Sequence, residues 1–65
     1  MSKIHFINEL GFTVLIFKIN QESLEEEIIA EVENHGQIQA DGFVGQEFLV
    51  RKLEDNTLGA VVVAA

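Results

Sequence analysis

The chain has 65 residues, 48% of them hydrophobic, and its 11 acidic residues outnumber 4 basic ones to give a formal net charge of -7. This charge argues against nucleic acid and anionic membranes as partners, because both bind through basic surfaces. Cysteine is absent, which excludes disulfides and thiolate metal sites, so a domain this small must rely on tight packing or on association with another chain.

The whole chain, residues 1–65, is expected to form a single domain. No apolar run approaches the ~20 residues that a membrane-spanning helix needs. The N-terminal segment lacks the long apolar core and small-residue cleavage site of a secretory signal. Together with the lack of cysteine, these features predict a cytoplasmic protein.

The first third of the chain predicts two strands. Residues 3–7 alternate loosely between polar and apolar, and residues 12–19 are almost entirely β-branched, aromatic or aliphatic, as strands prefer. Residues 8–11, with asparagine and glycine, have the composition of a tight turn. We therefore expect an N-terminal β-hairpin.

Residues 20–36 predict one helix of about four turns. Asn20 or Ser23 would cap its start, glutamates would fill its first turns, and Gly36 would end it. An apolar stripe at helical spacing supports the prediction. The stripe consists of Leu24, Ile28, Val32 and His35, with Ile29 beside it.

The remainder of the chain returns to a period of two. Residues 37–40 predict a short strand, residues 41–42 a turn, residues 47–53 a further strand, and residues 54–57 another turn. Residues 58–65 would form the last strand, antiparallel to the one before it. The predicted fold class is therefore α+β: a small, mainly antiparallel sheet in the order ββαββ or ββαβββ, with one helix across one face.

The strands carry more apolar surface than one helix can cover. Both faces of residues 12–19 are apolar, and so are both faces of the C-terminal strand. The sheet could curl into a small roll that buries part of its second face in a monomer. Otherwise the second face or an edge meets another chain, and we predict a homodimer on this ground. The predicted self-association residues are Leu15, Phe17, Val61, Val62 and Val63.

The sequence gives no sign of catalysis. No glycine-rich phosphate loop or nucleophile motif is present, and the two histidines, His5 and His35, lack the further ligands that a zinc site needs. The glutamates of residues 22–33 have the pattern of a solvated or partner-facing surface rather than of a calcium loop. We predict no enzyme activity, no catalytic residues, no metal site and no cofactor.

Two functions remain. The first is a small regulatory protein that occupies a basic protein surface in the manner of an inhibitor or antitoxin, its carboxylates imitating nucleic-acid phosphates. Glu26, Glu27 and Glu33, on the outer side of the predicted helix, would make this contact. The second is a structural or accessory subunit that assembles through its apolar sheet, with the glutamates serving solubility alone.

Overall fold

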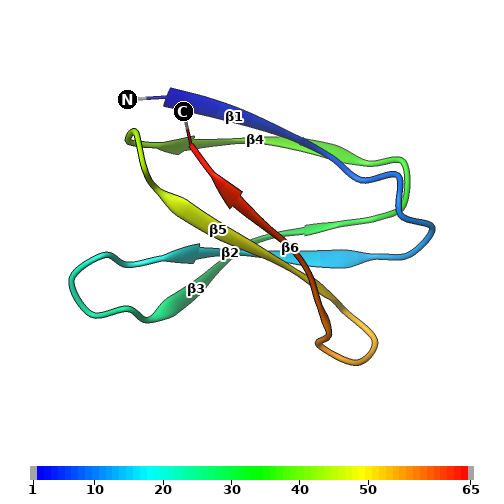
Figure 1. Ribbon diagram of the computed structural model, residues 1–65. Coiled ribbons are helices and arrows are strands. Elements are labelled where there is room, and N and C mark those ends of the chain that lie inside the picture. The colour runs from blue at the N-terminus through cyan, green and yellow to red at the C-terminus, as the bar shows by residue number, and fades with distance from the viewer. Residues whose placement is uncertain (1, 65) are drawn as a thin grey trace.

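The computed structural model describes residues 2–64, and every regular element in that part of the chain is a β-strand. The strands are β1 (Ser2–Ile7), β2 (Val14–Ile19), β3 (Glu26–Val32), β4 (Gln37–Gly42), β5 (Glu47–Lys52) and β6 (Leu58–Val63). They form two antiparallel sheets, one with the order β1-β4 and one with the order β3-β2-β5-β6 (Figure 1). The predicted α+β class, with a helix across one face, is therefore wrong, and the described chain is all-β.

Residues 2–42 form one long β-hairpin that bends in its middle. β1 pairs along its length with β4, and β2 pairs with β3. At the bend the ladder continues through the N–H of Asn8, which donates to the carbonyl of Gly36 at 2.9 Å. The two halves of the hairpin consequently belong to different sheets. The predicted hairpin between residues 3–7 and 12–19 is wrong, because β1 pairs with β4 and β2 lies in the other sheet.

The side chain of Asn8 holds this bend. It is 4% exposed, and its Nδ2 donates to the carbonyl oxygens of Phe12 at 2.8 Å and Val32 at 2.9 Å. Its Oδ1 accepts from the N–H of Leu10 at 3.1 Å. Both the amide nitrogen and the oxygen are thus satisfied inside the fold, which a buried amide requires. One asparagine therefore ties the loop between β1 and β2 to the end of β3.

The segment predicted as a helix consists of a loop, strand β3 and a turn. Leu24 and His35 have left-handed backbone angles, φ 63° and φ 68°, which a right-handed helix cannot contain. The expected N-cap, Asn20, caps a turn instead: its Oδ1 accepts from the N–H groups of Glu22 at 2.9 Å and Ser23 at 3.1 Å. Asparagine favours both kinds of cap for the same reason, its short side chain bonding nearby backbone.

The spacing of apolar residues explains why the helix prediction failed. Ala30 and Val32 point to the core at strand spacing, whereas Ile28, which faces Phe17, points outward because the register shifts between Ile16 and Phe17. The shift gives the apolar residues of β3 a spacing that resembles the spacing of a helix. The pairing of β3 with β2 then decides the matter, since it supplies a full ladder that a local helical preference cannot match.

The C-terminal half follows the sequence prediction more closely. β5 pairs with β2 on one side and with β6 on the other, so the predicted antiparallel pairing of the last two strands is confirmed. The turn between β4 and β5 falls later than predicted, where the N–H of Gln46 donates to the carbonyl of Phe43 at 2.8 Å. Gly45 has φ 90° in this turn, an angle that glycine adopts without strain.

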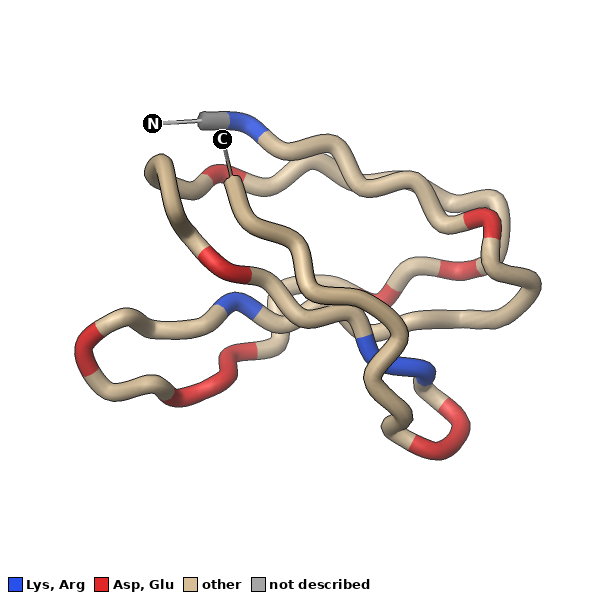
Figure 2. The backbone as a smooth tube through the Cα atoms, in the orientation of Figure 1, with Lys and Arg blue, Asp and Glu red and all other residues tan. Residues whose placement is uncertain are grey.

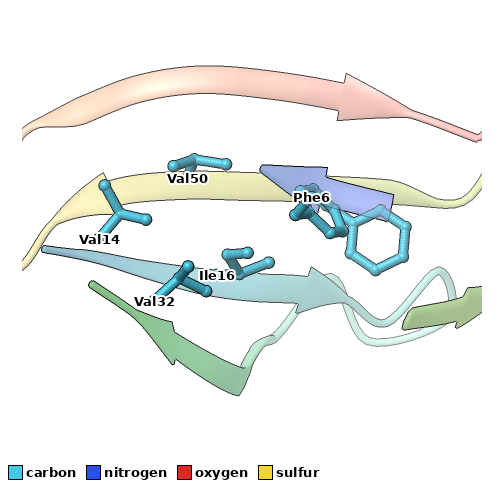
Figure 3. Packing of buried hydrophobic residues seen from close by; sticks show 6 residues of the cluster. Phe6, Val14, Ile16, Val32 and Val50 are labelled. Carbon is cyan, nitrogen blue, oxygen red and sulfur yellow. The ribbon is translucent and has the colours of Figure 1, made fainter. Parts of the chain in front are cut away.

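The hydrophobic core lies between the two sheets. Phe6 comes from β1, Val14 and Ile16 from β2, Val32 from β3, and Phe48 and Val50 from β5. The rings of Phe6 and Phe48 meet edge to face, with centroids 5.4 Å apart, and join the sheets. Figure 3 shows Phe6 beside the valine and isoleucine side chains of the other sheet. Gln46 closes one end of this core, because its buried Nε2 donates to the carbonyl of Ile19 at 2.6 Å.

Candidate interaction surface

The outward side of the four-stranded sheet is mostly apolar. Residues directly opposite each other on paired strands share a face of the sheet. The strand register places one apolar residue from each of the four strands in a single line, which we call the apolar row: Ile28, Phe17, Leu49 and Val61. Leu15, Ile19, Leu58 and Val63 flank the row on the same side. These eight side chains together make up what we call the outer apolar face.

Much of this face is open to solvent. Ile28 is 59% exposed, Val61 55% and Val63 57%, whereas Leu15, Phe17 and Leu49 nearer the middle are half-buried. Exposed apolar side chains that are contiguous, rather than scattered singly, mark surfaces that bind other molecules. The outer apolar face is therefore the candidate functional surface of the chain.

The outward side of the two-stranded sheet is different in kind. Its cross-strand pairs are Lys3 with Asp41, His5 with Gln39, and Ile7 with Gln37. The imidazole of His5 is also hydrogen-bonded to the side chain of Gln37. Apart from Ile7 this is a polar surface, as expected of a sheet with one face in water.

Four charged residues share the side of the sheet that carries the outer apolar face, Glu26 and Glu31 on β3 and Glu47 and Arg51 on β5. On β5 the outward side chains are Glu47, Leu49 and Arg51, so an acid, an apolar residue and a base follow one another at strand spacing. The guanidinium of Arg51 lies 5.8 Å from the centroid of the Phe17 ring, and its Nε donates to Glu26 Oε1 at 3.2 Å. The arginine is thus held flat against the face by an aromatic ring and a carboxylate.

The structure brings together most of the predicted self-association residues. Leu15, Phe17, Val61 and Val63 all lie on the outer apolar face. Val62 does not: it is opposite Phe48, points to the core and packs against it. Sequence reasoning missed Ile28, because it was assigned to a helix, and Leu49, although the alternation in residues 47–52 could have indicated its direction. That these residues mediate association stays a prediction.

The predicted acidic face does not exist as a helix surface. Glu26 and Glu27 are neighbours on β3, so their side chains point to opposite sides of the sheet, and Glu33 follows the end of that strand. All three are exposed. The acidic residues of the whole chain are dispersed over its loops and strands, while β6 carries no charge (Figure 2).

A groove of about 320 Å³ opens between the two sheets on the side of β6. Its walls are mainly apolar core residues and the inward side of β6, including Phe6, Val50, Ala60 and Val62. Glu9 is the single charged residue of this lining. The groove therefore offers contact area but no constellation of acid, base and nucleophile for catalysis.

The titratable groups in the described part of the chain are dispersed. Within residues 2–64 no group of three or more histidine, aspartate or glutamate side chains is placed to hold a metal ion. His5 lies on the outward side of β1, and His35 lies in the turn between β3 and β4. The two histidines therefore do not share a face of one sheet. Hydrogen bonds from the side chain and backbone of Thr57 lower the pKa of Asp55, which sits in the turn between β5 and β6.

Comparison with known protein families, curated proteins and solved structures finds no match to the chain. Across residues 2–64, no helix is long and apolar enough to cross a membrane. Function must accordingly be argued from the surfaces themselves.

Proposed function

We propose that this chain is a non-catalytic subunit that works by binding protein through its outer apolar face. The observation that carries the proposal is the apolar row, which crosses all four strands of one sheet and is half open at both ends. Burial of such a row on a partner removes apolar area from water, which is the main driving force of protein association. A structural or accessory subunit uses a surface of this kind.

The size of the face is suited to a protein rather than to a small ligand. A sheet of four strands at ~4.8 Å spacing, with about six residues per strand at ~3.3 Å, measures roughly 20 by 20 Å. Small ligands bind in concave pockets that enclose most of their surface. The outer apolar face is the outward side of a sheet whose other side packs on the core, so it fits a broad contact with another protein.

Charge substitution at the centre of the face tests the proposal. We expect Leu49→Glu to abolish the complexes that the tagged wild-type protein forms, whether with itself or with another protein. Ile7→Glu is the matched control, since Ile7 is 61% exposed on the outward side of the other sheet. Mass-resolved measurement of the purified proteins and of their captured complexes gives the answer. Complexes that persist in Leu49→Glu, or a wild type that forms none, would contradict the proposed function.

The exposed glutamates favour a second candidate, a contact with a basic protein surface. Every glutamate from Glu22 to Glu33 is exposed, and Glu26 is already paired with Arg51. Such a contact would weaken steeply as salt is raised. Reversal of Glu27 and Glu33 to lysine should abolish it, and unchanged affinity for the captured partner would exclude this candidate. An inhibitor-like role remains a prediction within this candidate, and a cytoplasmic location remains a prediction for either one.

A further inference from the structure

We propose that the partner on the outer apolar face is a second copy of this chain, related by a two-fold axis that runs along the apolar row. This inference rests on the proposed function and names the partner of the same surface. The two four-stranded sheets would stack face to face, as in a β-sandwich. Each strand would lie over its own counterpart with its direction reversed, and the contact would be isologous.

The two-fold axis makes specific pairs of residues meet. Residues of the apolar row would face their own copies across the axis. A residue on one flank of the row would face the opposite flank of the second copy. On β2 this places Ile19 over Leu15 of the second copy, which joins two apolar side chains. On β6 it places Val63 near Leu58 of the second copy, again apolar against apolar.

The charges on β5 are complementary under the same operation. Glu47 and Arg51 flank Leu49 at equal spacing on the outward side. Reversal of β5 over its counterpart therefore sets Glu47 opposite Arg51 of the second copy, and Arg51 opposite its Glu47. One strand thus supplies two ion pairs across the interface (Figure 2 shows the acid and base at opposite ends of β5). Arg51 can join such a pair and keep its bond to Glu26, because a guanidinium has five N–H donors.

The remaining charges of the face lie at its rim. Glu26 and Glu31 are on β3, an edge strand, and the operation brings Glu26 toward Glu31 of the second copy. This like-charge approach opposes association. Sheet twist reduces it, because stacked sheets cross at about 30° and their corners move apart. The carboxylate of Glu26 is in addition neutralised by Arg51 within its own copy.

The available area favours the whole face over an edge. Two faces of roughly 20 by 20 Å have about 800 Å² of area together, which is the size of a small, weak interface. Pairing through the free edge of β6 alone would use one strand, about a quarter of that width. The apolar face would also stay exposed in an edge-paired dimer. The face-to-face arrangement is the one that covers it, and its dissociation constant should fall roughly in the micromolar range of small interfaces.

Charge reversal tests the arrangement directly. In Glu47→Arg two bases would face two bases across the interface, and in Arg51→Glu two acids would face two acids. We expect each purified variant to dimerise at least about tenfold more weakly than wild type, because like charges oppose association strongly at an interface. Asp41→Arg makes the same change of charge on the outward side of the other sheet, and it should dimerise as wild type does. Sedimentation equilibrium over a wide range of protein concentration gives the constants.

Mixing the two variants provides the decisive outcome. The introduced arginine of one would face the introduced glutamate of the other, and the native residues at the partnered positions would do the same. An equimolar mixture should therefore form heterodimers that native mass spectrometry resolves, with affinity recovered relative to either variant alone. This recovery requires both variants to be folded, so it cannot result from a loss of structure. Variants that dimerise like wild type, or a mixture without recovery, would overturn the arrangement.

The wild-type protein separates this inference from the proposed function. A wild type that stays monomeric at every concentration overturns self-pairing. If that monomer still captures a different protein through a contact that Leu49→Glu abolishes, the proposed function stands. A wild-type dimer that Leu49→Glu dissociates and Ile7→Glu leaves intact supports both.

Discussion

Two sheets enclose the core, and their outward sides differ. The sheet formed by β1 and β4 exposes mainly lysine, histidine, glutamine and aspartate, whereas the sheet formed by β2, β3, β5 and β6 exposes mainly leucine, isoleucine, valine and phenylalanine. Both sheets direct apolar residues inward, as the shared core requires. The two-stranded sheet therefore alternates like a sheet with one side in solvent. The four-stranded sheet has the pattern of a sheet that is covered on both sides.

The difference shows that the four-stranded sheet carries more apolar residues than the core of the chain contains. The described core cluster contains only six buried side chains, and several other large apolar side chains of the four-stranded sheet are exposed. A domain of this size has a small margin of stability, so apolar residues left in water have to be accounted for by an interaction. The two-stranded sheet, whose outward side is mainly polar, has no such excess of apolar residues.

The largest expected effect comes from breaking the contact that joins the sheets. Phe48 is fully buried and its ring meets Phe6 of the other sheet. Phe48→Ala should lower the free energy of unfolding by about 3–5 kcal/mol, as for other buried aromatic residues, and this is a large part of the stability of a small domain. Phe43→Ala is the control, since Phe43 is 48% exposed in a turn and should cost less than about 1 kcal/mol. Urea unfolding followed by circular dichroism measures both, and equal losses would show that the sheets are not held by this core.

A smaller effect is expected from the bend that separates the sheets. In Asn8→Asp the shape is kept, but the Nδ2 donor is replaced by an oxygen that faces the carbonyls of Phe12 and Val32. Loss of these bonds in a buried site should lower the free energy of unfolding by about 3 kcal/mol near neutral pH. Asn34→Asp should be close to neutral, because the exposed Asn34 acts as an acceptor for the N–H of Gly11 and an aspartate can do the same. Thermal unfolding of both variants tests this, and an unaffected Asn8→Asp would mean that the amide does not hold the bend.

Sequence patterns predicted the strands better than their pairing. Residues 14–19, 47–52 and 58–63 are rich in β-branched and aromatic side chains, and all three are strands. The pairing of β1 with β4 joins residues that are far apart in the chain, and no local signal specifies it. The helix error has the same origin, because the ladder with β2 decides the structure of residues 26–32 and no local signal specifies it.

The candidate surface was partly visible in the sequence for a physical reason. Residues 12–19 are apolar on both sides of the predicted strand, so each side should pack against other apolar groups. This pattern was enough to predict Leu15 and Phe17 as surface residues that mediate association. The run of three valines in β6 does not indicate which of them point inward, because every position is apolar. The register irregularity between Val50 and Arg51 and their partners on β6 sets their directions and turns Val62 inward. Such an irregularity depends on the neighbouring strand, so the sequence of β6 alone does not predict it.

The smallest expected effect concerns the turn that closes the apolar sheet. Two hydrogen bonds from Thr57 lower the pKa of the Asp55 carboxyl from its ordinary value of 3.8. The larger effect comes from the side chain of Thr57, and the next from its backbone N–H, which donates to Asp55 Oδ1 at 3.0 Å. A pKa that is lower in the folded than in the unfolded protein adds stability above the unfolded pKa, and that stability is lost as pH falls through the folded pKa. Asp55→Asn should therefore be slightly less stable than wild type near neutral pH, and the difference should vanish in strong acid. Unfolding midpoints from pH 7 down to below about 3 measure it, with Thr57→Val as the companion variant that removes the side-chain donor. A difference that persists unchanged in acid would show that the charge of Asp55 does not stabilise this turn.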